Sequence, residues 1–403
     1  MRPLVFLQWF IGTVVGLTLL AVALTVGADP YRLYGTSVTP GWTEAKPRIY
    51  QQVSIARTYQ LERTVPRVLL LGNSRVEVGF DPETGAWPAD SAPVFNAAFA
   101  GRDLFFSLLM LRESIALSPP RAVVLGVDFQ DFLTAPTPSA TPLPQRDPDE
   151  RRLIVTRDGE INSERWLQVW QDYFTATLTI DAVADSVLTL VDQDKRTSAT
   201  MTPLGFNPRN EYLLFTQRSG YRGLFDQRNR AYQIVYSRAP KPDFTEAQRI
   251  ANFRYLQAIM AVAAQNKIPL TIFTYPYHSD YLEMLHRLGL WQSFEGWKRA
   301  LVEVTEEPRR KDGVRVFDFA DYNEMTTERV PPSGDTRSEM RWYWEAGHFK
   351  SALGDELVKV MFGNGTKLGY VLTTDNIEGV LATIRTNRDA FMRSADASKD
   401  VEN

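Results

Sequence analysis

The chain has 403 residues, enough for two domains or for one domain carrying an insertion. Hydrophobic residues make up 44% and charged residues 23%, a balance typical of a globular protein. Its formal net charge of −3 provides no basic surface of the kind that nucleic acid requires, so we expect no nucleic-acid partner. Cysteine is absent, which excludes disulfides, a thiolate zinc site and a cysteine nucleophile.

The N-terminal segment is predicted to cross a membrane. Residues 4–27 carry no charge, and a helix of this length spans a hydrocarbon core of roughly 30 Å. The run exceeds the usual apolar stretch of a signal peptide and no clear small-x-small cleavage site follows it, so residues 1–28 are predicted to be a signal anchor rather than a cleaved signal peptide. With Arg2 before the span, the positive-inside rule places everything after Asp29 outside the cytoplasm.

The next part of the chain alternates between strand and helix patterns. Residues 29–64 are a mixed juxtamembrane segment with one amphipathic stretch. Short apolar runs in RVLLLGNS from Arg67, at 93–101 and at 121–129 predict buried strands, with a helix over 103–116. Such alternation predicts parallel strands joined by right-handed crossovers.

The alternation stops and then resumes. Residues 135–242 begin with a proline-rich loop and are predicted to be an insertion or cap. Further strands and helices then follow, so residues 65–134 and 243–384 are predicted to form one three-layer α/β/α domain with a mainly parallel sheet. The polar residues 385–403 are predicted to form a frayed tail. The resumed elements are a helix over 244–266, a strand over 267–276, a helical pair after it, a strand over 313–320 and a helix over 351–363.

Candidate functional groups follow the predicted strands, where ligands bind in open parallel sheets. Ser74 follows Gly72 and Asn73 and is either a nucleophile or a helix N-cap. Gly101 provides either a backbone N–H for an oxyanion or an ordinary turn. Asp128 either accepts hydrogen bonds from nearby loops or lines the site.

The chain has three histidines, at 278, 286 and 348. Glu345 precedes His348 by three residues across a predicted turn, so it can accept the Nδ1–H and leave Nε2 free to take a proton from a serine. His278 either contacts substrate or caps the next helix, and His286 is predicted to be structural. We expect no metal and no cofactor, because neither an HExxH spacing nor a glycine-rich nucleotide loop is present.

Three short blocks resemble the SGNH/GDSL hydrolase superfamily, in the branch related to alginate O-acetylation proteins. They are LLLGNSR, FNAAFAG, and WEAGHF followed by SALGDEL. The resemblance covers roughly residues 65–130 and 245–363. It implies a flavodoxin-like α/β fold, with Ser74 as nucleophile, His348 as base, Glu345 as the acid and Gly101 as an oxyanion donor. Arg75 matches an arginine that often follows the serine in this branch.

Two residues depart from the family pattern. A further family block, at the end of the third strand, normally reads G-x-N-D with asparagine as an oxyanion donor. This chain has Gly126-Val127-Asp128-Phe129 there, and an ionised aspartate only accepts hydrogen bonds and would repel an oxyanion. Loss of one oxyanion donor can cost about 10²–10³ in turnover. Glu345 stands where aspartate is usual, and this is a milder change.

The resemblance and the anchor together predict an acyl-ester hydrolase or O-acetyltransferase in the bacterial inner membrane, with its catalytic domain in the periplasm. We expect its substrate to be an acetylated carbohydrate or another acyl ester, and its partner to be a membrane acyltransferase. Trp342 and Trp344 offer either stacking faces for sugars or core packing. The departure at Asp128 leaves open a catalytically inactive subunit that binds glycan or acts as a scaffold, and a purely structural membrane-tethered subunit is a third possibility.

Overall fold

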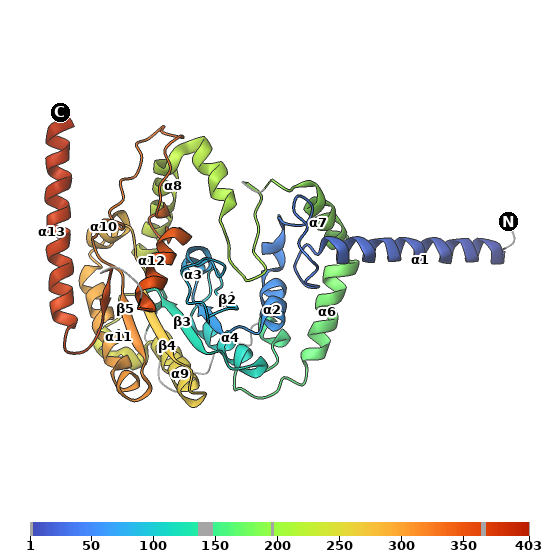
Figure 1. The fold of residues 1–403 in the computed structure, drawn as a ribbon, viewed down its shortest axis with the longest axis horizontal. Coiled ribbons are helices and arrows are strands. Elements are labelled where there is room, and N and C mark those ends of the chain that lie inside the picture. Colours follow the sequence, from blue (N-terminus) through green and yellow to red (C-terminus); the bar gives the residue numbers. More distant parts are fainter. Residues whose placement is uncertain (1–2, 136–147, 195–196, 364–367, 403) are drawn as a thin grey trace. The chain divides into compact units, whose positions relative to one another are not determined.

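The computed structural model describes residues 3–135, 148–194, 197–363 and 368–402. Within these ranges the chain forms two compact units (Figure 1). The first unit comprises Met1–Thr64 and Arg146–Leu214, and the second comprises Val65–Gln145 and Phe215–Asn403. The first unit therefore combines the N-terminal residues with much of the stretch that the sequence predicts to be an insertion.

The second unit is built on a six-stranded sheet in the order β2-β1-β3-β4-β5-β8. All neighbouring strands are parallel except β8, which is antiparallel to β5. This confirms the prediction of an α/β fold with a mostly parallel sheet. The strands are β1 (Val68–Leu71), β2 (Val94–Asn96), β3 (Ala122–Val127), β4 (Leu270–Thr274), β5 (Arg315–Asp318) and β8 (Tyr370–Val371).

The strand order decides where a site can form. Because the order runs 2-1-3-4-5, the chain turns to opposite sides after β1 and β3, and the edge between these two strands is a topological switch point. Leu71 lies opposite Leu125 in the register, so the residues that follow both strands emerge at the same edge. Ser74 follows β1 and Asp128 follows β3 at this edge.

The helices of the second unit include the crossovers between the strands. Helix α4 illustrates how the sequence sets their limits: Asp103 caps it by accepting the Phe106 N–H at 3.4 Å, and it ends before Ser118, which is extended. The helices are α3 (Ser74–Gly79), α4 (Leu104–Leu117), α5 (Phe129–Phe132), most of α8 (Asn210–Arg238), η3 (Phe244–Arg249), α9 (Ala251–Gln265), α10 (Ser279–Arg287), α11 (Trp291–Asp312), α12 (Ser351–Met361) and α13 (Ile377–Glu402).

Three local features differ from the prediction. The helix predicted over 244–266 is broken, because Ile250 is extended and fully buried between η3 and α9. The turn predicted between Glu345 and His348 is present, but it joins two strands that the sequence does not predict, β6 (Tyr343–Glu345) and β7 (His348–Phe349), in a short hairpin. Residues 385–402 continue helix α13 where a frayed tail was predicted, since the buried Ile377, Leu381 and Ile384 hold its first turns at helical spacing.

The first unit contains α1 (Pro3–Ala28), which is long and apolar enough to cross a membrane. Its residues 3–20 are all exposed, as a lipid-facing helix requires. The other helices of this unit are η1 (Ile49–Gln52), α2 (Val53–Thr64), η2 (Pro148–Arg152), α6 (Arg165–Leu178) and α7 (Ile180–Val191).

Candidate active site

Ser74 and His348 meet at the carboxyl edge of the sheet. The Ser74 Oγ lies 2.8 Å from the His348 Nε2, although the two residues are 274 positions apart in the chain. Ser74 is the first residue of α3 and is half-buried, whereas its neighbours Asn73 and Arg75 are buried. The serine hydroxyl is therefore the accessible group of this turn.

The β6–β7 hairpin places the carboxylate beside the imidazole. Glu345 and His348 are paired across the hairpin, and the Glu345 Oε1 accepts a hydrogen bond from the His348 Nδ1. The Glu345 Oε2 accepts the Gly347 N–H at 2.8 Å, which fixes the carboxylate within its own turn. With Nδ1 protonated toward Glu345, Nε2 is left as the acceptor for the Ser74 hydroxyl.

Two glycines allow this hairpin to reach Ser74. A Cβ on Gly79, at the end of α3, would lie 2.1 Å from the Phe349 ring. A Cβ on Gly354, in α12, would lie 1.8 Å from the Gly79 carbonyl oxygen. Since no side chain fits at either position, α3 packs directly against β7 and α12, and His348 is held against the start of α3.

Glu345 is ionised in this environment. It is fully buried, and burial alone would raise its pKa, but the charge of and hydrogen bond with His348 outweigh burial and lower the pKa to about 2. Arg228 contributes as well, with its Nε 3.9 Å from Oε1. The ionised carboxylate can therefore stabilise the imidazolium that forms when His348 takes a proton.

Helix α8 contributes residues that the sequence interpretation missed. The Tyr232 hydroxyl donates to the Glu345 Oε1 at 3.1 Å and lies 3.3 Å from the His348 Nδ1. Arg228 precedes Tyr232 by four residues, so both lie on one face of the helix. The four-residue spacing of these two side chains is visible in the sequence, but it lies in the stretch 135–242, which the loss of strand–helix alternation predicts to be an insertion.

Asp128 and Arg75 form a buried ion pair. The Asp128 Oδ2 also accepts from the Asn73 Nδ2 at 2.8 Å, and its Oδ1 accepts from the Tyr277 hydroxyl at 2.7 Å and from the Gln130 N–H at 3.1 Å. The two residues singled out separately in the sequence are thus partners. Because Arg75 neutralises the charge of Asp128, the repulsion expected between the Asp128 carboxylate and an oxyanion is offset.

Tyrosine rings surround the Arg75 guanidinium. Its Nη2 donates to the Tyr281 hydroxyl at 3.0 Å. Burial alone would lower the pKa of Arg75, but Asp128 and the tyrosine hydroxyls raise it well above its ordinary value. The guanidinium is therefore a permanent buried cation under Ser74. The rings within 6 Å of its carbon are those of Tyr232, Tyr275, Tyr277 and Tyr281.

The turn that carries Gly101 is tied to the Ser74 turn at two points. The Phe99 N–H donates to the Gly72 carbonyl at 3.1 Å, and the Ala100 N–H donates to the Glu77 Oε2 at 3.0 Å. Gly101 is exposed and has φ of +72°, a conformation that favours glycine. Its role as an oxyanion donor stays a prediction, because only its proximity to the turn follows from these contacts.

The other two histidines lie outside the Ser74 contacts. The His278 Nδ1 accepts the Asp280 N–H at 3.1 Å, and its Nε2 lies 2.8 Å from the Glu328 carbonyl. His278 thus caps α10, the second of the two roles left open, and burial lowers its pKa. His286 stacks on Trp291 with ring centroids 3.9 Å apart.

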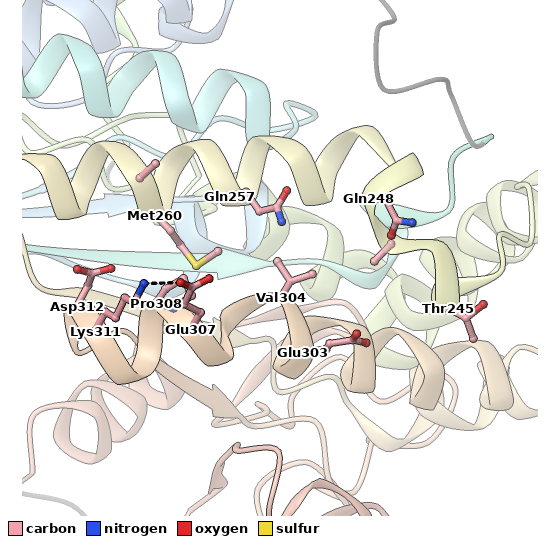
Figure 2. A pocket seen from close by; sticks show the side chains of 12 residues that line it. Thr245, Gln248, Gln257, Met260, Glu303, Val304, Glu307, Pro308, Lys311 and Asp312 are labelled. Carbon is pink, nitrogen blue, oxygen red and sulfur yellow. Dashed lines mark hydrogen bonds and ion pairs between the residues drawn. The ribbon is translucent and has the colours of Figure 1, made fainter.

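A pocket of about 620 Å³ lies between η3, α9 and α11 in the same unit (Figure 2). Its charged lining groups are Glu303, Glu307, Lys311 and Asp312, all on α11, where Lys311 and Glu307 form an ion pair at 2.5 Å. None of the residues that line it contacts Ser74, His348 or Glu345.

Among the described residues, no group of three or more His, Asp or Glu side chains could hold a metal ion.

Comparison with known proteins adds no family assignment. No protein-family model matches the chain, and no curated protein is significantly similar to it.

Proposed function

We propose that this protein is an SGNH-type acyl-ester hydrolase or O-acetyltransferase that acts on carbohydrate outside the cytoplasm. The observation that carries the proposal is the continuous hydrogen-bonded chain from the Ser74 Oγ through His348 to the buried, ionised Glu345. A nucleophile, a base and an orienting carboxylate in this sequence of contacts are the parts that acyl transfer through serine requires.

The contacts support a role for each of these residues. The Ser74 oxygen attacks the acyl carbon while its proton passes to the His348 Nε2, and Glu345 stabilises the imidazolium. His348 then protonates the departing alcohol, and an acyl-serine remains. In the second half, water or a sugar hydroxyl gives its proton to the His348 Nε2 and attacks the acyl carbon. The bond from that carbon to the Ser74 Oγ then breaks, and Nε2 returns the proton to Oγ, which restores Ser74 and neutral His348. The Ser74 and Gly101 amides would hold the oxyanion.

The finer assignments belong to the same proposal. The strand order supports a three-layer, flavodoxin-like arrangement in which residues 135–242 are an insertion. The apolar helix α1 supports a single-pass anchor in a bacterial inner membrane with the Ser74 unit in the periplasm. An acetylated polysaccharide, or an acetyl donor supplied by a membrane acyltransferase, is the substrate class that the family resemblance implies.

The test uses the full-length chain in phosphatidylcholine nanodiscs. Truncation after residue 28 is avoided, because Lys46 donates to the Ala28 carbonyl at 2.5 Å and the end of α1 is buried. Hydrolysis of p-nitrophenyl acetate and of an acetylated polysaccharide is compared in the wild type, Ser74→Ala and His348→Ala. His286→Ala serves as the matched control, since that imidazole stacks on Trp291.

Loss of turnover by at least about 10²-fold in both site variants, with His286→Ala active, supports the proposal. Equal rates in all four proteins would contradict it and would favour a second candidate, a catalytically inactive subunit that binds glycan or acts as a scaffold. That candidate is favoured by one observation: Asp128 accepts hydrogen bonds on both oxygens and provides no third oxyanion donor.

A further inference from the structure

Helices α6 and α7 of the first unit have their apolar side chains on the outside. On α6, Trp166, Trp170 and Phe174 recur every four residues and are 59–71% exposed. On α7, Ile180, Val187 and Val191 are 48–87% exposed. Large apolar side chains gathered on one surface mark an interaction site.

The inward faces of the two helices are polar, the reverse of a soluble amphipathic helix. Asp172 is buried and accepts from the Arg152 guanidinium at 3.0 Å and from the Tyr59 hydroxyl at 3.0 Å. Asp185 is buried and accepts from the Tyr31 hydroxyl at 2.6 Å. These buried hydrogen bonds fix which side of each helix faces the protein, and they hold the apolar side chains on the outside.

Both helices pack against α1, the helix that can cross a membrane. Figure 1 shows α6 running across the base of α1 rather than alongside its length. Thr25 and Ala28, at the end of α1, are buried. The exposed part, Pro3–Leu20, is eighteen residues long. It spans about 27 Å at 1.5 Å per residue, close to the thickness of a hydrocarbon core, roughly 30 Å.

We propose that α6 and α7 lie in the interfacial layer of the lipid bilayer, with their exposed apolar side chains inserted beside the end of α1. The position just beyond the exposed part of α1 is the level at which tryptophan and tyrosine collect in membrane proteins. The two helices are bent by 56° relative to each other, which suits a pair lying on a surface better than a straight span.

The side chains on the exposed faces of α6 and α7 favour insertion into the apolar part of the interface rather than attraction to anionic headgroups. Residues 166–194 contain no lysine or arginine. The same range contains five aspartates. Anionic lipid should therefore not strengthen binding, unlike that of a polybasic segment. A protein partner of the same polarity is the competing occupant, and it would leave the surface in water when only lipid is present.

The absence of native cysteine allows clean single-site labelling of the full chain. Trp170→Cys and Val187→Cys are spin-labelled in phosphatidylcholine vesicles, and collision with oxygen is compared with collision with a water-soluble nickel chelate. Val15→Cys, within α1, is the membrane reference, and Gln265→Cys, at the exposed end of α9, is the water reference. The Val187 site leaves every aromatic side chain of the surface in place.

The proposal expects both α6 and α7 labels to favour oxygen over the nickel chelate by several-fold relative to residue 265, with no increase on adding phosphatidylglycerol. It rests on α1 crossing the membrane, and residue 15 separates the two claims. A lipid-embedded label at 15 with water-exposed labels at 170 and 187 would overturn this inference and favour a protein partner. Water exposure at all sites would overturn the anchor as well.

Discussion

Replacing Asp128 by asparagine gives the chain the residue that the SGNH pattern G-x-N-D has at this position. The same change leaves Arg75 without its buried counter-ion. The amide oxygen can still accept from the Tyr277 hydroxyl and the Gln130 N–H. Its NH₂ group, however, would face the Asn73 NH₂ and the Arg75 guanidinium. All three groups are hydrogen-bond donors, so none of them could accept from another. Removing one partner of a buried pair costs about 3–5 kcal/mol of the free energy of unfolding.

The assay is urea unfolding of the full-length chain, followed by tryptophan fluorescence. Asp128→Asn should lower the midpoint without changing the slope, which would show a loss of stability rather than of compactness. Asp226→Asn, on the exposed face of α8, is the matched control and should stay within about 0.5 kcal/mol of the wild type. The double variant Arg75→Met/Asp128→Asn should recover much of the loss, because it removes both buried charges.

An unchanged midpoint together with faster ester hydrolysis in Asp128→Asn would refute this reasoning. Asp128 would then be a lost oxyanion donor rather than the partner of Arg75.

Three further predictions concern the base and its support. Tyr232→Phe removes a donor to Glu345 and should slow p-nitrophenyl acetate hydrolysis by about 2–10-fold, the equivalent of one hydrogen bond; a rate equal to that of the wild type would exclude a positioning role. Glu345→Gln should reduce kcat by about 10²–10⁴. The folded pKa of Glu345, about 2, lies below its unfolded value, so the ionised carboxylate stabilises the fold fully above roughly pH 4.5 and loses this effect as the pH falls toward 2. Glu345→Gln should therefore show a smaller fall in the free energy of unfolding over that pH range, measured by urea titration. Gly354→Ala places a Cβ against the Gly79 carbonyl and should lower the free energy of unfolding by about 1–3 kcal/mol, whereas Gly379→Ala, with open space around it, should be neutral or stabilising in the same urea unfolding assay.

The sequence predicted the strands that carry the site because they are strongly patterned. β1 and β3 are short and almost entirely apolar, and buried parallel strands have that composition. Their place at one sheet edge then follows from the alternation with helices. The proximity of Ser74 to His348 was predicted from block order, and the contact at 2.8 Å agrees with it.

The parts that escaped prediction depend on contacts distant in sequence. The β6–β7 strands have three and two residues, too few to show a period of two. Tyr232 reaches Glu345 from a helix more than a hundred residues earlier, and no local pattern indicates that packing. Asp128 was recognised as unusual, but its pairing with Arg75 became visible only once the two strand ends were side by side.

Covalent labelling tests the central claim, that His348 activates Ser74 as a nucleophile, most directly. The full-length chain in nanodiscs is treated with a fluorophosphonate, and the modified residue is located by peptide mass spectrometry. The account predicts one phosphonyl group on Ser74, no label in Ser74→Ala, and labelling slowed at least about 10²-fold in His348→Ala. Absence of label in the folded wild type, or equal labelling with and without His348, would contradict it.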